Sequence, residues 1–268
     1  MLPRLAILKV FSLIVCLTLC WRASATGAPD ALADWSRLDD DAVTQQARQL
    51  GAQGLMQRLE SGVEHLPEYE LWMARQERLS TGWNEQPFLH HIKYRHSPRQ
   101  VYMSWLPGGP KSGQEILFDE TRRSDAMYGH LSGVFNVMSM WTSLDGSLAR
   151  SNSMHSIREV GLQSVVDILK AQQEVRRRAG VSIEPDEIRI DRIQGERVLA
   201  VSWPATPGLA HAYAARTRLY LDLKHPWVRQ VEAWDERGQL KERVYYQRVQ
   251  PARFTARDFD PQNPDYRF

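Results

Sequence analysis

Histidine side chains are the first place in this chain to look for chemistry. His90, His91 and His96 lie close together, and imidazole is the commonest metal-binding side chain in proteins. A metal site needs further ligands at suitable spacing, but no cysteine, HExxH motif or pair of carboxylates accompanies these histidines. We therefore expect no bound metal and no cofactor.

Nucleophilic catalysis finds equally little support in the sequence. The chain has no GxSxG or SxxK motif, and its two cysteines, Cys16 and Cys20, both precede residue 26. Asp145, Ser151 and His155 are only neighbours in sequence, whereas catalytic triads are recognised by their geometry in space. We expect a protein that is not an enzyme, with hydrolysis of an envelope polymer as the alternative.

Apolar and aromatic side chains are more informative, because they occur on both faces of the same expected strands. A sheet of that kind is covered on both sides or curves around an apolar cavity. The alternative for these rings is that they simply fill a core. A cavity for an apolar ligand would be lined by Leu71, Met73, Val101, Met103, Trp105, Phe135, Met138, Trp141, Val201, Trp203, Leu219, Leu221 and Val231.

An antiparallel meander over residues 216–250 is the element around which the rest of the chain is arranged. Leu219 and Leu221 alternate with polar residues, which is the period of two that a strand with one buried face requires. Pro226 ends the first strand because proline lacks a backbone donor, and Gly238 can adopt the positive φ of the second turn. The same alternation predicts strands at residues 69–79, 88–95, 101–106, 115–119, 188–193 and 198–203.

Helices are expected at two places. Residues 31–63 combine spaced apolar side chains with an acidic start at Asp39–Asp41, which predicts one or two amphipathic helices. Residues 157–178 predict another helix, which ends in arginines followed by Gly180.

Two further segments do not fit the alternating pattern. Residues 127–144 are the most apolar stretch after the N-terminal segment, and we expect them to lie against the sheet or to form a partly exposed flap. The tail, residues 258–268, is too rich in proline and aspartate for a strand and is expected to be an extended strap.

The N-terminal segment, residues 1–25, has the pattern of a cleaved signal peptide. Arg4 and Lys9 precede an apolar core, and Ala23-Ser24-Ala25 supplies small residues for cleavage. We therefore expect an exported, periplasmic protein whose residues 26–268 form one domain, without disulfides. An uncleaved anchor and acylation of Cys20 are the alternatives.

The charge balance argues against nucleic acid as a partner. The whole chain has 34 basic and 32 acidic residues, and its small excess of positive charge is lost when residues 1–25 are removed. Proteins that bind nucleic acid usually carry a basic patch or a strongly basic balance. We expect a monomer.

Several sequence motifs resemble a bacterial family known as domain of unknown function 1571. The resemblance is carried by residues 101–105, 113–118, 156–162 and 259–266, and it extends over about 31–268. The order of the expected elements is also similar to that of periplasmic lipoprotein carriers of the LolA type. This second resemblance implies an α+β fold: a strongly curved antiparallel sheet, an open half-barrel, with helices packed in its hollow.

The resemblance to lipoprotein carriers implies a function by analogy of fold. It predicts a non-enzymatic periplasmic protein that binds a lipid or an acylated protein in a cavity between sheet and helices. The alternative is an envelope sensor or scaffold that binds another protein through the same fold and carries no lipid.

Overall fold

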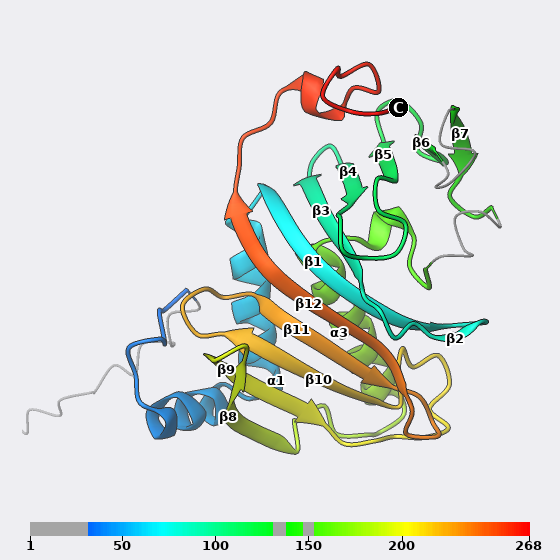
Figure 1. Cartoon of the computed structure of the whole chain (residues 1–268). Coiled ribbons are helices and arrows are strands. Elements are labelled where there is room, and N and C mark those ends of the chain that lie inside the picture. The colour runs from blue at the N-terminus through cyan, green and yellow to red at the C-terminus, as the bar shows by residue number, and fades with distance from the viewer. Residues whose placement is uncertain (1–31, 131–137, 147–152) are drawn as a thin grey trace, which may run out of the picture.

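A curved, open antiparallel sheet covered on one face by helices is the framework of the molecule. The computed structural model describes residues 32–130, 138–146 and 153–268. Helices α1 (Asp40–Glu64) and α3 (Leu162–Arg178) both lie on the same side of the sheet (Figure 1). The expected fold class, an α+β fold with helices in the hollow of an antiparallel sheet, is confirmed. Within the described residues, no helix has the length and apolar character to span a membrane.

Over the residues that the structure describes, the sheet contains 12 strands, all of whose pairings are antiparallel. Eleven of them follow the order β7-β6-β5-β4-β3-β1-β12-β11-β10-β9-β8, and β2 pairs with β1 beside this path. The strands are β1 (Glu68–Leu79), β2 (Gly82–Trp83), β3 (Phe88–Arg95), β4 (Gln100–Trp105), β5 (Glu115–Asp119), β6 (Ala126–His130), β7 (Ser139–Ser143), β8 (Glu187–Ile193), β9 (Glu196–Trp203), β10 (Arg216–Asp222), β11 (Val228–Trp234) and β12 (Leu240–Pro251).

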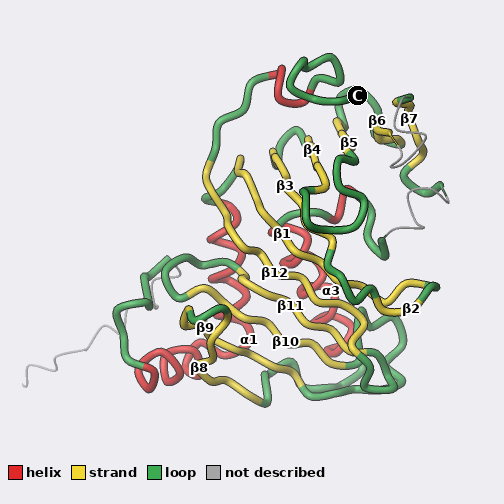
Figure 2. Tube along the Cα trace, viewed as in Figure 1, coloured by secondary structure: helices red, strands yellow, loops and turns green. Residues whose placement is uncertain are grey.

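The sheet consists of two meanders joined along one pair of strands. The first contains β1 and β3 to β7, the second β8 to β12, and β1 pairs with β12 between them (Figures 1 and 2). The expected meander over residues 216–250 is confirmed as β10, β11 and β12. Its pairing with β1 lay beyond what local alternation can predict, because the two strands are far apart in the chain.

Helix α1 begins and bends as its sequence dictates. The Asp39 side chain accepts a hydrogen bond from the Ala42 amide at 2.7 Å and caps the helix, as the acidic start predicted. Gly51 interrupts the helix with a φ of 61°, and Glu184 accepts a hydrogen bond from the Ala52 amide at 2.9 Å just after this break. The expectation of one or two helices is therefore met by two helical stretches joined at Gly51.

Helix α3 starts later than the sequence predicted. Residues Ile157–Glu159 form a 3₁₀ turn, Val160 is extended, and Gly161 has a φ of 101° before the helix begins at Leu162. The expectation of one continuous helix over 157–178 was therefore wrong at its start. The helix starts late because the chain passes close to Tyr69 of β1 at this point. The Leu162 amide donates to the Tyr69 hydroxyl at 2.8 Å, and a side chain at position 161 would collide with that hydroxyl.

The main hydrophobic core fills the hollow between the sheet and the helices. It joins alternate residues of the strands to the inner faces of α1 and α3, and Tyr69, Leu71, Ile92, Val101 and Leu219 are almost completely buried in it. One face assignment differs from the sequence pattern. Val228 and Val231 share this core although simple alternation puts them on opposite faces, because the β10–β11 register shifts at Leu221, whose partner is Val228.

The apolar stretch 127–144 joins the sheet where the structure describes it. β6 and β7 are antiparallel strands at the end of the sheet beyond β5, so this stretch extends the sheet and does not lie across it. Met138 and Met140 are exposed, with 66% and 45% of their surface accessible. Residues 131–137, which include Phe135, lie outside the described residues, as does the expected signal peptide.

The tail after β12 covers the outer face of the sheet. It contains a short 3₁₀ turn, Ala256–Phe259, and passes near the ends of β3 to β6 (Figure 1). The Tyr266 ring stacks on Tyr102 of β4 with 3.9 Å between ring centroids, and Phe268 contacts the rings of Tyr128 and His130. These contacts explain why every residue of β5 is buried, since both faces of that strand are covered.

Candidate functional site

Three small cavities lie in a row inside the hollow, beneath α3 and the 3₁₀ turn that precedes it. We name them the His90, Tyr213 and Trp203 cavities after one lining residue of each, and their volumes are about 50, 40 and 20 Å³. The His90 and Tyr213 cavities have in common the lining residues Arg75, His155 and Val160. The Tyr213 and Trp203 cavities have in common Leu169, Gln172 and Thr217. The row is therefore one interrupted space: the Tyr213 and Trp203 cavities lie against α3, and the His90 cavity lies against the 3₁₀ turn that precedes it.

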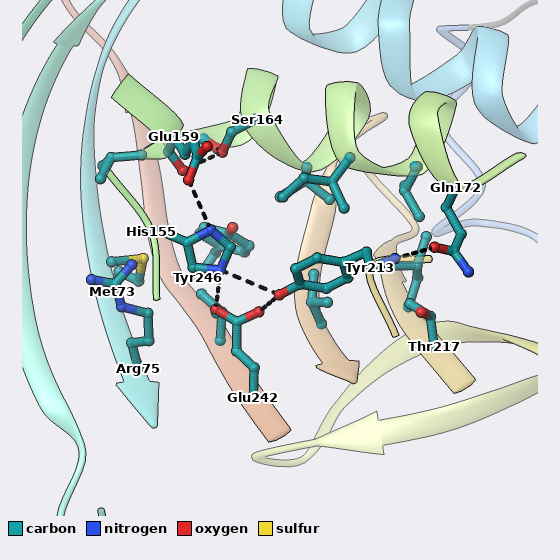
Figure 3. Close-up of a pocket in the computed structure, with 18 residues that line it drawn as sticks. Met73, Arg75, His155, Glu159, Ser164, Gln172, Tyr213, Thr217, Glu242 and Tyr246 are labelled. Atoms are coloured by element: carbon teal, nitrogen blue, oxygen red, sulfur yellow. Dashed lines mark hydrogen bonds and ion pairs between the residues drawn. The ribbon is translucent and has the colours of Figure 1, made fainter. Parts of the chain in front are cut away.

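A polar cluster divides the first two cavities. His155 places its Nε2 atom 3.0 Å from Glu242 Oε1 and 3.2 Å from the Tyr213 hydroxyl, and its Nδ1 atom 3.3 Å from Glu159 Oε2 (Figure 3). The Tyr213 hydroxyl donates to the other carboxylate oxygen of Glu242. A buried carboxylate is thus held by an imidazole and a phenol.

A second buried carboxylate, Glu77, completes the cluster. Its Oε1 atom accepts hydrogen bonds from the Ser153 hydroxyl at 3.0 Å and the Met154 amide at 3.1 Å. Its Oε2 atom makes no hydrogen bond in the described structure and lies 3.6 Å from Nε of Arg75. Glu77 is fully buried, so this oxygen has also lost contact with water.

The protonation of the cluster follows from its contacts. Burial alone would lower the pKa of His155, but its hydrogen bonds to Glu159 and Glu242 outweigh burial and raise that pKa to about 9. Burial works to raise the pKa of Glu242, but its contacts with His155, Tyr213 and Arg75 lower it overall. At neutral pH these shifts therefore favour an imidazolium beside a carboxylate.

The sheet and the chain crossing it position these groups. Glu77 on β1 and Glu242 on β12 are direct cross-strand partners, so the joint between the two meanders sets their spacing. His155 comes from the segment leading into the 3₁₀ turn, and Tyr213 from the loop between β9 and β10. Two carboxylates directly opposite each other repel unless a cation lies between or beside them. His155 and Arg75 supply that positive charge.

Residues 66–268 match the family described as "Protein of unknown function (DUF1571)". The chain belongs to this family. The match covers every strand of the sheet, and it includes His155 and the two buried glutamates. It confirms the resemblance inferred from the motifs. No curated protein matches the chain.

Solved structures similar to this DUF1571 protein include members of the group that the sequence resembled. An uncharacterized conserved protein from Thermus thermophilus is 12% identical, with 79% of this chain and 95% of that chain covered and a TM-score of 0.43. A LolA superfamily protein from Nitrosomonas europaea is 10% identical, with 76% and 97% covered and a TM-score of 0.30. In the MucA/MucB complex of Pseudomonas aeruginosa, the matched chain is 16% identical, with 75% and 60% covered and a TM-score of 0.37.

Most residues predicted to line an apolar cavity lie in the hollow of the DUF1571 domain, and others lie at or beside the edge strand β7. Six of them line the cavity row: Met73, Leu219 and Val231 the Tyr213 cavity, Met103 and Trp105 the His90 cavity, and Trp203 the Trp203 cavity. Leu71, Val101, Val201 and Leu221 are buried in the same core but line none of these three cavities. Trp141 on β7 packs against Tyr128, and the exposed Met138 lines none of the three.

The histidines considered for metal binding are separated by the sheet. His90 is buried on the hollow side against Trp105, and burial lowers its pKa well below the ordinary value. His91 lies on the opposite face, with its Nε2 atom 2.8 Å from Glu70 Oε2. Alternation along β3 makes this inevitable, because successive side chains point to opposite faces.

The polar cluster was missed at the level of sequence. His155 was considered only beside Asp145 and Ser151, and the two glutamates were not singled out among many acidic residues. The signal that unites them is the β1–β12 register, and local alternation contains no information on which strands pair. Glu77 could have been noticed as a charge on the face of β1 that also carries Leu71 and Met73.

Proposed function

We propose that this protein is an exported, non-enzymatic, periplasmic protein that binds an apolar or amphipathic ligand in its hollow, beneath α3. The ligand class is a lipid or the acyl chain of an acylated protein. The row of three cavities beneath α3 and the 3₁₀ turn that precedes it is the single observation that carries this proposal. Its lining combines aliphatic side chains with a few polar groups, which is typical of sites for small apolar ligands.

The length of the cavity row suits an extended chain. The cavity-lining residues of α3 extend from Ser164 to Arg176, which is about 18 Å of helix, and one acyl chain crosses about 15 Å, half of a bilayer's hydrocarbon core. A buried methylene contributes about 0.8 kcal/mol, so even part of an acyl chain would hold usefully. The polar cluster at Arg75 and His155 offers hydrogen-bond donors for a head group.

The three cavities are too small to hold a lipid chain unless they enlarge. No cavity of the row exceeds about 50 Å³, which is space for a few water molecules only. Entry of a chain therefore requires that side chains between neighbouring cavities move apart or that α3 shifts away from the sheet. We propose that ligand binding includes this opening.

The proposal is tested on protein exported with its own signal and purified from the periplasm. Native mass spectrometry and solvent extraction should reveal bound lipid, and a fluorescent fatty acid should bind to delipidated protein. Val231→Phe narrows the Tyr213 cavity and should weaken fatty-acid binding about tenfold. Val198→Phe is the matched control, because Val198 is buried in a small apolar cluster outside the main core and lines none of the three cavities. Clean protein that takes up no fatty acid would contradict the proposal.

A second function, binding of another envelope protein without lipid, is favoured by the small cavity volumes. In that case the hollow is a filled core, and the protein acts as a sensor or scaffold. Crosslinking in intact cells followed by purification separates the two functions. A stoichiometric protein complex free of lipid supports the second, and bound lipid that Val231→Phe abolishes supports the first.

A further inference from the structure

Two buried carboxylates that face each other inside a protein are costly unless something binds them. Glu77 and Glu242 are cross-strand partners on β1 and β12, and their exposed fractions are 0% and 3%. The proposed ligand-binding function gives them no role, since an apolar chain gains nothing from two negative charges. His155 and Arg75 lie beside them and offset their charge, and a metal ion placed between the two carboxylates and His155 would bind all three side chains directly.

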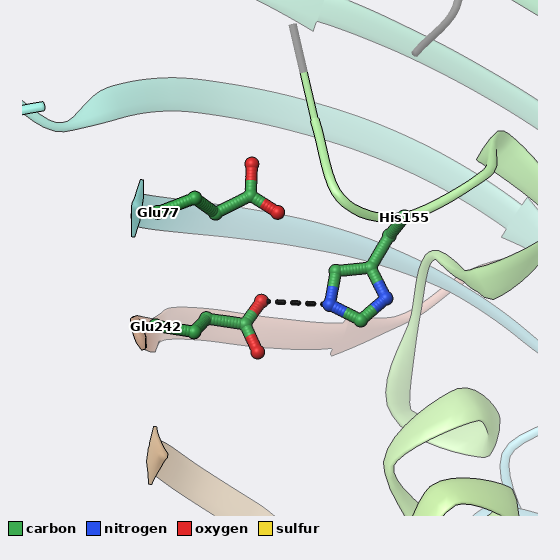
Figure 4. Close-up of side chains that lie close together, drawn as sticks. All are labelled: Glu77, His155 and Glu242. Atoms are coloured by element: carbon green, nitrogen blue, oxygen red, sulfur yellow. Dashed lines mark ion pairs between the residues drawn. The ribbon is translucent and has the colours of Figure 1, made fainter. Parts of the chain in front are cut away.

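We propose that Glu77, His155 and Glu242 together bind one divalent transition-metal ion, for which Zn²⁺ is the best match. One potential ligand atom from each residue lies within 4.8 Å of the others, and Figure 4 shows the three side chains converging. The ligands of a tetrahedral zinc site lie about 3.4 Å apart, given Zn–N and Zn–O distances of about 2.0–2.2 Å. Binding therefore needs shifts of about 1 Å.

The Oε2 atom of Glu77 is placed to accept a further ligand. Glu77 Oε2 has no hydrogen-bond donor in the described structure, although Oε1 of the same carboxylate has two. Among the described residues, the cation paired with it is Arg75, whose Nε lies 3.6 Å away, beyond hydrogen-bonding distance. A metal ion bound between Glu77 and His155 would satisfy this oxygen.

Glu159 is positioned to orient His155 as a metal-binding histidine. Its carboxylate lies 3.3 Å from Nδ1 of His155, while Nε2 faces Glu242 at 3.0 Å. Metal-binding histidines usually donate one ring N–H to a carboxylate, which leaves the other nitrogen free to coordinate. The metal would then take the place of the Nε2 proton.

The charges of the three ligands also fit a divalent ion. With His155 neutral, Glu77 and Glu242 bring two negative charges to the site, and a divalent ion neutralises them. Arg75 and Glu159, which lie beside the ligands, carry opposite charges and so change this balance little. Imidazole favours zinc and its neighbours in the transition series over Mg²⁺ and Ca²⁺, which prefer oxygen ligands alone.

Three protein ligands leave one coordination position for another group. The Tyr213 hydroxyl lies 3.2 Å from His155 Nε2, and both His155 and Glu242 line the Tyr213 cavity, from which a fourth group could reach the ion. Zinc sites with three protein ligands characteristically keep such an open position. The inference concerns the metal alone and does not depend on what else the hollow binds.

The test uses the full exported protein, freed of metal with a chelator and titrated with Zn²⁺ alone by calorimetry. We expect one ion per chain by elemental analysis and a rise in the thermal midpoint that Mg²⁺ and Ca²⁺ do not produce. Glu77→Gln and His155→Gln should each weaken Zn²⁺ binding about 100-fold or more, because even the loss of a residue that orients a ligand costs about 10–100-fold. His91→Gln is the matched control, since it removes a His–Glu pair on the opposite face.

A second pair of measurements keeps the test decisive if a variant with a buried substitution fails to fold. Glu159 is half exposed, so Glu159→Gln should fold and weaken Zn²⁺ binding about 10-fold or more. Co²⁺ bound to the unaltered protein should give the visible absorption of a four-coordinate site with nitrogen and oxygen ligands. Absence of Zn²⁺ binding would overturn the proposal. So would Zn²⁺ binding that is unchanged in Glu159→Gln but abolished in His91→Gln.

Discussion

Tyr69 and Gly161 meet at the point where the chain enters α3, and this contact fixes the height of the helix above the sheet. The Tyr69 hydroxyl accepts a hydrogen bond from the Leu162 amide, one of the four amides at the start of the helix that have no partner within it. A Cβ atom at position 161 would lie 2.5 Å from this hydroxyl and 3.0 Å from the ring of Tyr94. Glycine is therefore required here for two reasons, its φ of 101° and the space it leaves.

Replacement of Gly161 by alanine should separate these two reasons. We expect Gly161→Ala to destabilise the protein by about 1–3 kcal/mol more than Gly82→Ala, because overpacking adds to the cost of the unusual backbone angle. Gly82 is the matched control: its φ is 107°, and nothing lies within 4 Å of a Cβ built there. Thermal or urea unfolding followed by circular dichroism measures both. Equal losses of unfolding free energy in the two variants would mean that steric overlap with Tyr69 adds no cost at position 161.

Single residues were predictable from the sequence where a local rule applies to them. Asp39 caps α1, and His90 and Ile92 lie on the same buried face of β3, because capping and alternation depend only on neighbouring residues. The roles of Gly161 and Glu77 were not predictable, since both depend on strands that the chain forms elsewhere. The most informative residues of the hollow are thus the ones that local patterns leave out.

At the scale of elements, the C-terminal strap shows how a segment without strand character holds a sheet. Residues 258–268 were expected to be extended, whereas the structure folds them into a 3₁₀ turn and further hydrogen-bonded turns, and the sequence did not indicate which surface they cover. Lys93 on β3 donates to Asp258 at 2.8 Å, and the Tyr266 hydroxyl donates to the Asp258 carbonyl at 2.6 Å. The strap therefore links the end of the chain to the first meander, and it covers strands whose outer face carries Tyr102.

The contact between the strap and β3 should weaken in acid. Burial works to raise the pKa of Asp258, but Lys93 and the two hydrogen bonds from Thr255 lower it overall from its ordinary value of 3.8. The unfolded chain then takes up this proton first as the pH falls, so the stabilisation is complete above about pH 5 and is lost as the pH falls below 3.8 and through the lowered pKa of the folded protein. The contribution of such a partly exposed ion pair is about 1 kcal/mol or less.

Asp258→Asn isolates this effect, because asparagine can still accept the Thr255 hydrogen bonds while it lacks the charge. We expect the thermal midpoint of the unaltered protein to exceed that of the variant at pH 6, and the gap to close as the pH falls from 5 to 3. Differential scanning calorimetry across this range measures the gap. A gap that stays constant or widens in acid would show that the Asp258 charge does not stabilise the strap.

At the scale of the whole molecule, the pairing of β1 with β12 turns two meanders into one curved surface. Each meander was predictable from alternation and turn residues, whereas the joint between them was not, because strand partners distant in sequence leave no local pattern. The family resemblance supplied the overall shape that alternation could not. The polar cluster lies on this joint, with Glu77 and Glu242 contributed by opposite halves of the sheet.

The same architecture predicts an uneven distribution of local stability. β1 and β12 have hydrogen-bonded neighbours on both sides, whereas the cavity row leaves the inner face of α3 incompletely packed. Segments with fewer buried contacts open locally at lower free energy. In ligand-free protein, the amides of α3 should therefore exchange with solvent at least about tenfold faster than the central amides of β1 and β12, as followed by hydrogen exchange and mass spectrometry.

Addition of a fatty acid then tests whether the hollow is the binding site. A chain bound beneath α3 fills the cavities and must slow exchange in α3, because opening the helix would now also expose the ligand. The amides of residues 254–268 on the outer face serve as the internal control and should be unaffected. Slower exchange in the strap with no change in α3 would place the ligand on the outer face, and the hollow would then be a filled core beneath a helix that opens for another reason.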